Sequence, residues 1–534
     1  MSSVNLHIHD IIAEQPMPNR LNRARILFLF VALCSGEIDL QAQRLPLKGF
    51  DAYVQKTLRD WGCPGLAIAI VKNDSVVFAK GYGVRQMGNS AQVDEKTIFG
   101  IASCSKAFTA ASVAMLVDEK KISWDDPAAK YLDGFQLYDP YVTREITVRD
   151  LLSHRSGLPA FGGDLIWWGS TYSRDETLRR IRFVKPASSF RSRYAYQNIM
   201  FIAAGQVAAA VTGKTWEDFV KERIFLPLGM QSTSTSIRAL QGVEDIATPH
   251  MRVDGKTRAI AWRNLDNGSP AAGINSNAAD MARWIRLQLG RGAFQGKRIF
   301  STAVAEDMWS PQTLVSNSAP EPPLPAFLKG HVAAYALGWS IAEYRGKYLV
   351  RHYGETDGMS SVVGLLPEEA LGVVILTNLH VTSLHTALLY RIFDAFLRAK
   401  PEDWSTLYLK VRTNEESKAA AEAAVAEKAR AKESQPSLPL SRYEGKYSNT
   451  TYGDATVVDE GGKLVVRLGA SPTYIGDLEH WQYDTFLSRW RDPVAEKTFV
   501  SFTLNAAGEV DEMKLKIADF IDFGEYVFNR VQKK

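Results

Sequence analysis

Strand-forming segments in this chain fall into two blocks, residues 65–82 and 336–377, that lie far apart in the sequence. The first block opens with the apolar run GLAIAIV and, after a polar turn, continues in β-branched and aromatic residues, which predicts a hairpin. Between the blocks, from about 120 to 330, apolar residues recur mostly at helical spacing. We therefore expect one sheet assembled from distant segments, with the helical insert forming a separate lobe.

The second block predicts four strands and a closing helix, which complete the expected sheet domain. The strands are Ala336–Ala342, Tyr348–His352, Ser360–Leu366 and Leu371–Thr377, and the helix is Ser383–Leu397. Because ligand sites tend to lie between two lobes, we expect a site in the cleft between the sheet and the helical insert.

At 534 residues the chain is too long for a single core, and shifts in composition indicate further domains. The main domain is expected to span residues 46–400. Residues 401–438 contain a stretch rich in Ala, Glu and Lys and predict an exposed helical linker. From 439 to 534, short alternating runs separated by Gly, Asn and Asp predict an all-β module, a small barrel.

Residues 1–45 predict a targeting segment and an N-terminal extension rather than part of the fold. Arg20, Arg23 and Arg25 precede the apolar run Ile26–Cys34, and small and polar residues follow, which is the layout of a secretory signal peptide. The run is too short to span a bilayer, so we expect a secreted or periplasmic protein with no stable membrane span after signal removal. Lipid anchoring at Cys34 and a buried N-terminal helix are the alternatives.

Composition argues against several other classes of protein. The net charge of +4 is small for this length, and no basic stripe accompanies it, so we expect no nucleic-acid partner. The cysteines, Cys34, Cys63 and Cys104, show no zinc-ligand spacing with histidine. We therefore expect neither a metal nor an organic cofactor.

The motif Ser103-Cys104-Ser105-Lys106 places a serine and a lysine at i and i+3 at the start of an expected helix. Residues with this spacing lie on one helix face, so the amine can sit beside the hydroxyl. A serine becomes a strong nucleophile only when a neighbouring base takes its proton. Lysine can be that base if burial or nearby positive charge lowers its pKa from about 10.4.

Two further motifs follow in order, Tyr196-Gln197-Asn198 and His352-Tyr353-Gly354, and residues 151–159 read LLSHRSGLP. Together with Ser-x-x-Lys, they make residues 49–397 resemble the serine β-lactamase and penicillin-binding-protein-like hydrolases, in particular the branch of class C β-lactamases, D-stereospecific peptidases and related esterases. The resemblance implies an α/β (α+β) β-lactamase-like fold, with an antiparallel sheet flanked by helices and a helical lobe. Residues 440–447, LSRYEGKY, resemble the opening of a lipocalin-like C-terminal module.

The resemblance also implies roles for particular side chains. Ser103 would attack a carbonyl and form an acyl-enzyme, while Lys106 and Tyr196 would share the role of base, with the assignment between them left open. Asn198 offers both a donor and an acceptor, which suits a substrate amide. His352 stands where many relatives carry a lysine, which softens the demand for a substrate carboxylate.

The same resemblance also implies roles for the backbone along the strand edge that follows His352. Gly354 would let the backbone approach the substrate closely. The oxyanion hole would consist of the backbone N–H groups of Ser103 and Glu355, and one such donor is typically worth about 2.7–4 kcal/mol.

Structural interpretations compete with these roles. Tyr196 could be a half-buried aromatic, Asn198 a helix N-cap and His352 a satisfied core histidine. The loop pair His154 and Arg155 is interpreted as structural.

Cys104, about 100° around the helix from Ser103, should point away from the site. Trp167 and Trp168 fit either a cleft lining or simple packing. The chain lacks Lys-Thr-Gly, Ser-Asp-Asn and Gly-x-Ser-x-Gly motifs, which puts efficient β-lactam hydrolysis in doubt and argues against an α/β-hydrolase.

The sequence thus predicts a serine hydrolase that acts through an acyl-enzyme on small esters, amides or short peptides, including ones with a D-residue. The alternatives are a β-lactamase and a catalytically silent protein that binds peptides or peptidoglycan-like ligands.

Overall fold

The structure is a computed structural model that describes residues 45–532 apart from 254, 317, 319 and 518–523. The expected signal peptide therefore lies outside the described residues. In the part of the chain that is described, no helix combines the length and apolar character needed to cross a membrane.

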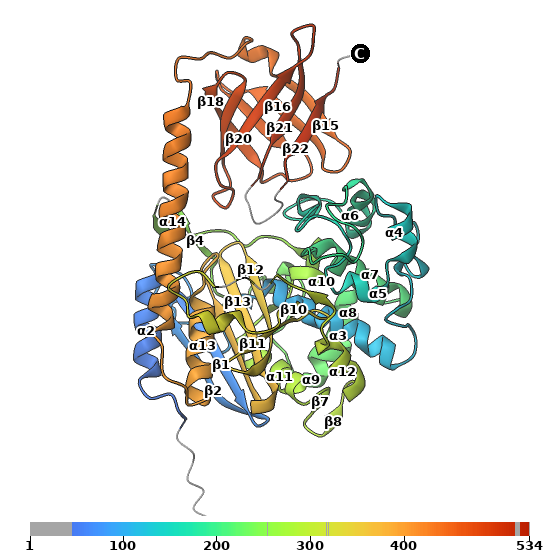
Figure 1. Cartoon of the computed structure of the whole chain (residues 1–534), viewed down its shortest axis with the longest axis vertical. Coiled ribbons are helices and arrows are strands. Elements are labelled where there is room, and N and C mark those ends of the chain that lie inside the picture. The colour runs from blue at the N-terminus through green and yellow to red at the C-terminus, as the bar shows by residue number, and fades with distance from the viewer. Residues whose placement is uncertain (1–44, 254, 317, 319, 518–523, 533–534) are drawn as a thin grey trace, which may run out of the picture. The chain divides into compact units, whose positions relative to one another are not determined.

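One antiparallel sheet of eight strands forms the centre of the main domain, in the order β2-β1-β14-β13-β12-β11-β10-β9. Figure 1 shows the N-terminal strands, in blue, lying in the same sheet as strands from beyond residue 330. The strands are β1 (Gly65–Lys72), β2 (Ser75–Gly83), β9 (Thr313–Leu314), β10 (Ala334–Tyr335), β11 (Ser340–Tyr344), β12 (Lys347–Thr356), β13 (Met359–Leu366) and β14 (Leu371–Thr377). The prediction of a sheet built from distant segments is confirmed, because β1 pairs with β14 from Leu66–Thr377 to Lys72–Leu371.

The apolar run of β1 is continuous because both faces of the sheet are covered. Leu66, Ile68 and Ile70 pack with helices α2 (Phe50–Trp61) and α13 (Leu384–Phe396). The small residues between them, Ala67 and Ala69, belong to the core on the opposite face. Helix α11 (Ala278–Leu289) packs on that face, although its residues fall inside the segment expected to form a separate lobe.

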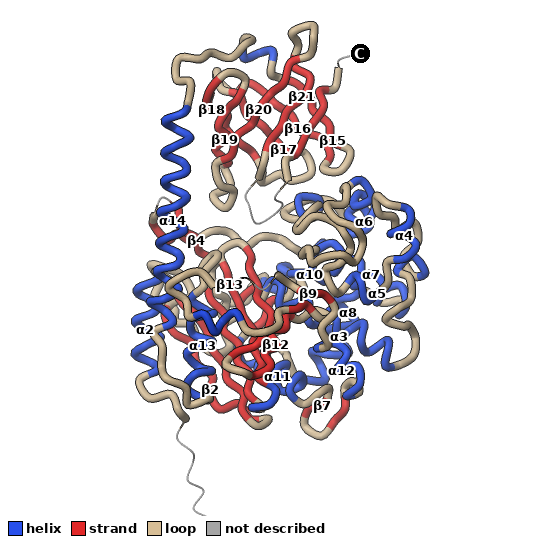
Figure 2. Tube along the Cα trace, viewed as in Figure 1, coloured by secondary structure: helices blue, strands red, loops and turns tan. Residues whose placement is uncertain are grey.

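The helical segment between the two strand blocks is made of many short helices joined by loops (Figure 2). Helices α3 (Ser105–Asp118) and α7 (Asn198–Thr212) contact each other at its centre and are buried along most of their length. The remaining elements are α4 (Pro140–Glu145), α5 (Val148–Leu151), α6 (Arg174–Arg180), α8 (Trp216–Val220), α9 (Leu226–Leu228), α10 (Ser269–Ala272), α12 (Thr302–Trp309), and the two-stranded pairs β3 (Phe99–Gly100) with β6 (Asn275–Ser276), β4 (His250–Val253) with β5 (Lys256–Ala259), and β7 (Ala293–Phe294) with β8 (Lys297–Arg298).

The expected strand Ala336–Ala342 was wrong in its first half. Residues 336–339 form the turn between β10 and β11, closed by a hydrogen bond of 2.7 Å from the Ala336 N–H to the Trp339 carbonyl. Gly338 within this turn has a φ of 75° and lies against α3, where a Cβ would come within 2.8 Å of the Lys106 carbonyl oxygen. The apolar residues of this segment therefore pack on α3 instead of extending the strand.

The C-terminal part contains a long helix followed by a barrel. Helix α14 (Trp404–Ala429) lies within residues 401–438, where the helical linker was expected, and its first residue, Trp404, is buried against α13. The barrel is closed and has eight strands: β15 (Gly445–Asn449), β16 (Gly453–Asp459), β17 (Leu464–Leu468), β18 (Ile475–Gln482), β19 (Thr485–Trp490), β20 (Thr498–Leu504), β21 (Val510–Leu515) and β22 (Tyr526–Arg530). The prediction of a small all-β barrel is confirmed.

Candidate active site

Ser103 lies in a single 3-10 turn, Ala102–Cys104, that leads directly into α3. Ala102 has a φ of 46°, a left-handed conformation that costs energy for a residue with a Cβ. Ser103 is partly exposed, whereas Ala102, Cys104 and Lys106 are buried. The turn therefore leaves the Ser103 side chain accessible and keeps its neighbours inside the core.

The Lys106 ammonium is surrounded by three oxygen atoms of the protein. Its Nζ donates to Ser103 Oγ at 3.0 Å, to Asn198 Oδ1 at 2.7 Å and to the Ala271 carbonyl oxygen at 3.0 Å. The side chain is fully buried, and this burial lowers the pKa of Lys106 to about 7. The charged ammonium form and the neutral amine form of Lys106 are therefore both populated near neutral pH.

The partners of Lys106 decide where the lone pair of the neutral amine points. The amide oxygen of Asn198 and the carbonyl oxygen of Ala271 can only accept hydrogen bonds. A neutral amine satisfies both with its two hydrogens, which leaves its lone pair directed at the third partner, Ser103 Oγ. This arrangement can remove the serine proton.

Tyr196 lies just before α7, and its phenol interacts with the Ser103 hydroxyl. The Lys106 Nζ lies 4.8 Å from the centroid of the Tyr196 ring. Desolvation of the phenol raises the pKa of Tyr196 well above its ordinary value, so the hydroxyl keeps its proton at neutral pH. The phenol can therefore donate to the serine oxygen.

Asn198 has both ends of its amide engaged by the protein. Its Oδ1 accepts from Lys106, and its Nδ2 donates to Asp164 Oδ2 at 2.6 Å. The other oxygen of Asp164 accepts from Trp167 Nε1 at 2.8 Å, and the Asp164 side chain is buried. The amide thus connects the lysine to a buried carboxylate, and its expected contact with a substrate stays a prediction.

Asp164 was not among the residues singled out from the sequence. It begins a short 3-10 turn, Asp164–Ile166, in a loop that follows two glycines, and no motif includes it. Its negative charge raises the pKa of Lys106 and so acts against the effect of burial. The tryptophan pair beside it packs in the core, which answers the question left open for Trp167 and Trp168.

His352 lies on β12 and makes hydrogen bonds through both ring nitrogens. Its Nδ1 is 2.6 Å from the Tyr353 carbonyl oxygen, and its Nε2 is 2.8 Å from the Tyr335 hydroxyl. Because a carbonyl oxygen can only accept, Nδ1 carries the hydrogen and Nε2 accepts from Tyr335. Burial lowers the pKa of His352 to about 3, so the ring is neutral.

The His352 ring lies near the other site residues, with its centroid 6.5 Å from that of Tyr196. The carbonyl of His352 also contacts Cys104 Sγ at 3.4 Å. The cysteine thus faces the sheet, and burial raises the pKa of the Cys104 thiol to about 12. The expectation that Cys104 points away from the site agrees with this contact.

Gly354 allows β12 to approach the segment that carries the serine. A Cβ at this position would lie 2.1 Å from the Ile101 carbonyl oxygen and 2.4 Å from Ser361 Oγ. Pairing of β12 with β11 ends at Arg351–Ser340, so residues 352–356 extend past the end of β11. Residues 352–356 therefore have a strand partner in β13 and none in β11.

The carboxyl group of Glu355 is held by residues of β13 and α13. It accepts a hydrogen bond from Ser360 Oγ and lies 3.9 Å from His385 Nε2. Burial raises the pKa of Glu355 to about 8. The site role that the sequence assigned to Glu355 concerns its backbone N–H.

His154 and Arg155 have structural contacts, as the sequence interpretation held. The His154 ring centroid lies 4.2 Å from those of Tyr196 and Tyr335, and its Nδ1 accepts from the Gln197 N–H at 3.0 Å. Burial lowers the pKa of His154 well below its ordinary value, so a neutral ring supports Tyr196. Arg155 donates to the buried carboxylate of Asp150 at 2.5 Å.

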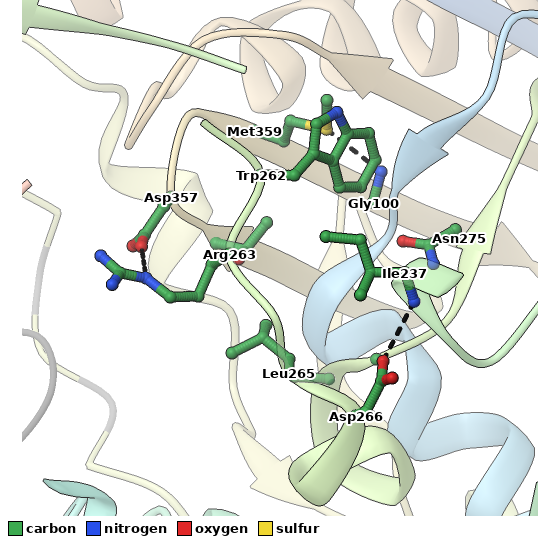
Figure 3. Close-up of a pocket in the computed structure, with 12 residues that line it drawn as sticks. Gly100, Ile237, Trp262, Arg263, Leu265, Asp266, Asn275, Asp357 and Met359 are labelled. Atoms are coloured by element: carbon green, nitrogen blue, oxygen red, sulfur yellow. Dashed lines mark hydrogen bonds and ion pairs between the residues drawn. The ribbon is translucent and has the colours of Figure 1, made fainter. Parts of the chain in front are cut away.

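A small pocket lies at Gly100, three residues before Ser103, and at Thr356, the last residue of β12 (Figure 3). Trp262, Leu265 and Met359 supply much of its apolar wall, and Arg263 and Asp357 pair with each other at its side. Its other lining residues include three that neighbour the site in sequence, namely Gly100, Ala272 and Thr356.

Comparisons with known proteins identify the family of the chain. A family model described as Beta-lactamase matches residues 50–396, and one described as a domain of unknown function (DUF3471) matches residues 429–530. An unguisins hydrolase of Aspergillus campestris is 31% identical over 427 residues, or 77% of each chain. An unguisins hydrolase of Aspergillus violaceofuscus is 30% identical over 391 residues, or 68% of each chain.

A solved structure, the octameric penicillin-binding protein homologue from Pyrococcus abyssi, has a similar fold. The match has a TM-score of 0.58 at 22% identity and covers 90% of this chain and 100% of that one.

Proposed function

The chain belongs to the Beta-lactamase family of serine hydrolases, and we propose that it acts through an acyl-enzyme on Ser103, formed from small esters, amides or short peptides. The membership confirms the resemblance and the fold class expected from the motifs. The observation that carries the mechanism is the contact of Lys106 Nζ with Ser103 Oγ and with two oxygens that only accept hydrogen bonds.

In the first step Ser103 Oγ forms a bond to the substrate carbonyl carbon, and its proton moves to Lys106 Nζ. The carbonyl oxygen becomes an oxyanion, for which we assign the backbone N–H groups of Ser103 and Glu355 as donors. Collapse of this intermediate expels the leaving alcohol or amine, which takes the proton held by Lys106, and leaves an ester on Ser103. Water then attacks that ester and gives a proton to the neutral Lys106 amine, and cleavage of the bond to Ser103 Oγ releases the acid as that proton returns to the serine oxygen.

We infer that Lys106, and not Tyr196, is the base in the first step. A base with a pKa close to the operating pH combines a useful population of its neutral form with useful basicity. Burial brings the pKa of Lys106 to about 7 and moves that of Tyr196 away from neutrality. Tyr196, which stays protonated beside Ser103 and Lys106, is placed to pass the proton held by Lys106 on to the leaving group.

Labelling with a fluorophosphonate probe tests the proposed nucleophile. We expect the wild-type protein to be labelled and to hydrolyse p-nitrophenyl acetate, and Ser103→Ala to lose both properties. The matched variant Cys104→Ala, at the adjacent buried position, should retain labelling. A folded wild-type protein that is neither labelled nor active would refute the proposal and favour a silent binding protein. Turnover of nitrocefin in the same assay would identify a β-lactamase.

A further inference from the structure

The basic side chains at this site are already held by other groups of the protein. His352, which stands where many relatives carry a lysine, donates from Nδ1 to the Tyr353 carbonyl and accepts at Nε2 from the Tyr335 hydroxyl. The side chain is buried at 3% exposure. A substrate carboxylate therefore finds no charge here and no free donor on the ring.

Lys106 is equally occupied. Its three hydrogen bonds go to oxygens of the protein, and the carboxylate that balances its charge, Asp164, is reached through the Asn198 amide. In the acylation step this amine receives the serine proton. It cannot also serve as the counter-charge for a substrate anion.

Arg263, the arginine at the wall of the bordering pocket, is paired with two carboxylates. Its Nε donates to Asp357, and its Nη2 donates to Asp492 at 2.6 Å, while the side chain is only 8% exposed. The same pocket contains the carboxyl group of Asp266. These carboxylates disfavour a substrate carboxylate in the pocket, because like charges repel and the guanidinium of Arg263 is already neutralised.

What the site does offer is backbone. Residues 352–356 of β12 extend past the end of β11, and Gly354 lies at the point of close approach to Ile101. A strand edge binds an extended substrate through uncharged N–H and C=O groups. Recognition of this kind suits a chain that continues on both sides of the scissile bond.

Resting on the proposed acyl-enzyme function, we propose that the site selects acyl donors with no carboxylate next to the scissile bond. The favoured substrates are esters and internal amide bonds, in contrast to the last peptide bond of a chain that ends in a free carboxylate.

Two matched esters test this selection, 3-carbamoylphenyl acetate and 3-carboxyphenyl acetate, which differ in the charge of the leaving group. The value of kcat/KM for each ester is divided by its uncatalysed rate of hydrolysis. We expect the carbamoyl ester to be favoured by at least about tenfold, since an unpaired charge in a desolvated site is costly. A ratio at or below one in the wild-type protein would overturn the inference and leave the hydrolase assignment intact.

Two variants test whether the residue at position 352 determines the ratio of the normalised kcat/KM values of the two esters. His352→Lys places an ammonium on the strand edge and should shift the ratio at least about tenfold toward the carboxylate ester. The control Val76→Lys adds the same charge at a 45% exposed position of β2 and should leave the ratio unchanged. An equal shift in both variants would contradict a local cause, and the wild-type ratio decides the question if His352→Lys does not fold. Absence of both turnover and Ser103 labelling would instead refute the proposed function.

Discussion

Replacing Asp164 with asparagine should move the pH at which the enzyme becomes active. Two hydrogen bonds of 2.7 Å and 2.6 Å, joined by one amide group, place the Asp164 carboxylate about 7 Å or less from Lys106 Nζ. At that distance and an effective dielectric constant of about 20, the attraction between the charges is about 2 kcal/mol. Removing it should lower the pKa of Lys106 by roughly 1.5 pH units.

The direction of the shift follows from the role of the lysine. In the proposed mechanism Lys106 acts as a base only when it is neutral, and burial sets its pKa at about 7 in the wild-type protein. When kcat/KM is plotted against pH, its rise on the acidic side should therefore have its midpoint near pH 7. In Asp164→Asn this acidic limb should move to lower pH. Relative to its own plateau, the variant should be more active than the wild type near pH 6. The plateau itself should fall, because a weaker base takes the serine proton less readily.

The assay is kcat/KM for p-nitrophenyl acetate between pH 5 and 9, together with the rate of fluorophosphonate inactivation, which reports on attack by Ser103. Trp167→Phe is the matched control, because it removes a hydrogen bond of 2.8 Å to the same carboxylate and keeps the charge. Its acidic limb should stay near that of the wild type. If the limb stays in place in Asp164→Asn, or moves equally in Trp167→Phe, the electrostatic reasoning is wrong.

Three further predictions follow from other contacts. Gly354→Ala should abolish most activity and destabilise the fold by about 2 kcal/mol or more, because its Cβ would lie 2.1 Å from the Ile101 carbonyl oxygen; unchanged kcat/KM and urea midpoint would contradict this. Tyr335→Phe should cost about 1–3 kcal/mol in urea unfolding, since it leaves the buried Nε2 of His352 without a donor, and a wild-type midpoint would argue against that bond. Asp150→Asn should cost about 2–4 kcal/mol at pH 7, because it removes the charge of a buried carboxylate that pairs with two arginines. The pKa of Asp150 is lowered in the fold, so its contribution is present above about pH 4 and lost as the pH falls below that; an equal cost at pH 3 would refute the ionic origin.

The sheet could be predicted from the sequence because its strands are buried on both faces and read as continuous apolar runs. In β1, large residues on one face alternate with alanines on the other, and both sets are buried. Strands β9 and β10, of two residues each, are too short to give a periodic signal. The turn before β11 was misjudged for a related reason, since its apolar residues are buried by contact with α3 and not by strand pairing.

Only part of the site could be predicted from the sequence, namely the part that depends on local geometry. The pair Ser103 and Lys106 is local, so helix geometry alone brings the two side chains together. The partners that set their chemistry are tertiary: Asp164 approaches from a loop, and Tyr335 approaches His352 from a two-residue strand. No spacing along the chain encodes either contact, so the roles of Asn198 and His352 as internally paired groups could not be derived from their motifs.

Two features keep the pKa of Lys106 from falling further than burial takes it: His352 is neutral, and Asp164 carries a negative charge. A lysine at position 352 would add a positive charge near Lys106 and lower its pKa further, as like charges do. The imidazole adds no such charge, and Asp164 supplies an opposing one, so burial alone brings the pKa down to about 7. In the proposed mechanism, the absence of a cation at position 352 would have two consequences: Lys106 would keep enough basicity to deprotonate Ser103 at neutral pH, and the site would lack a charged contact for a substrate carboxylate.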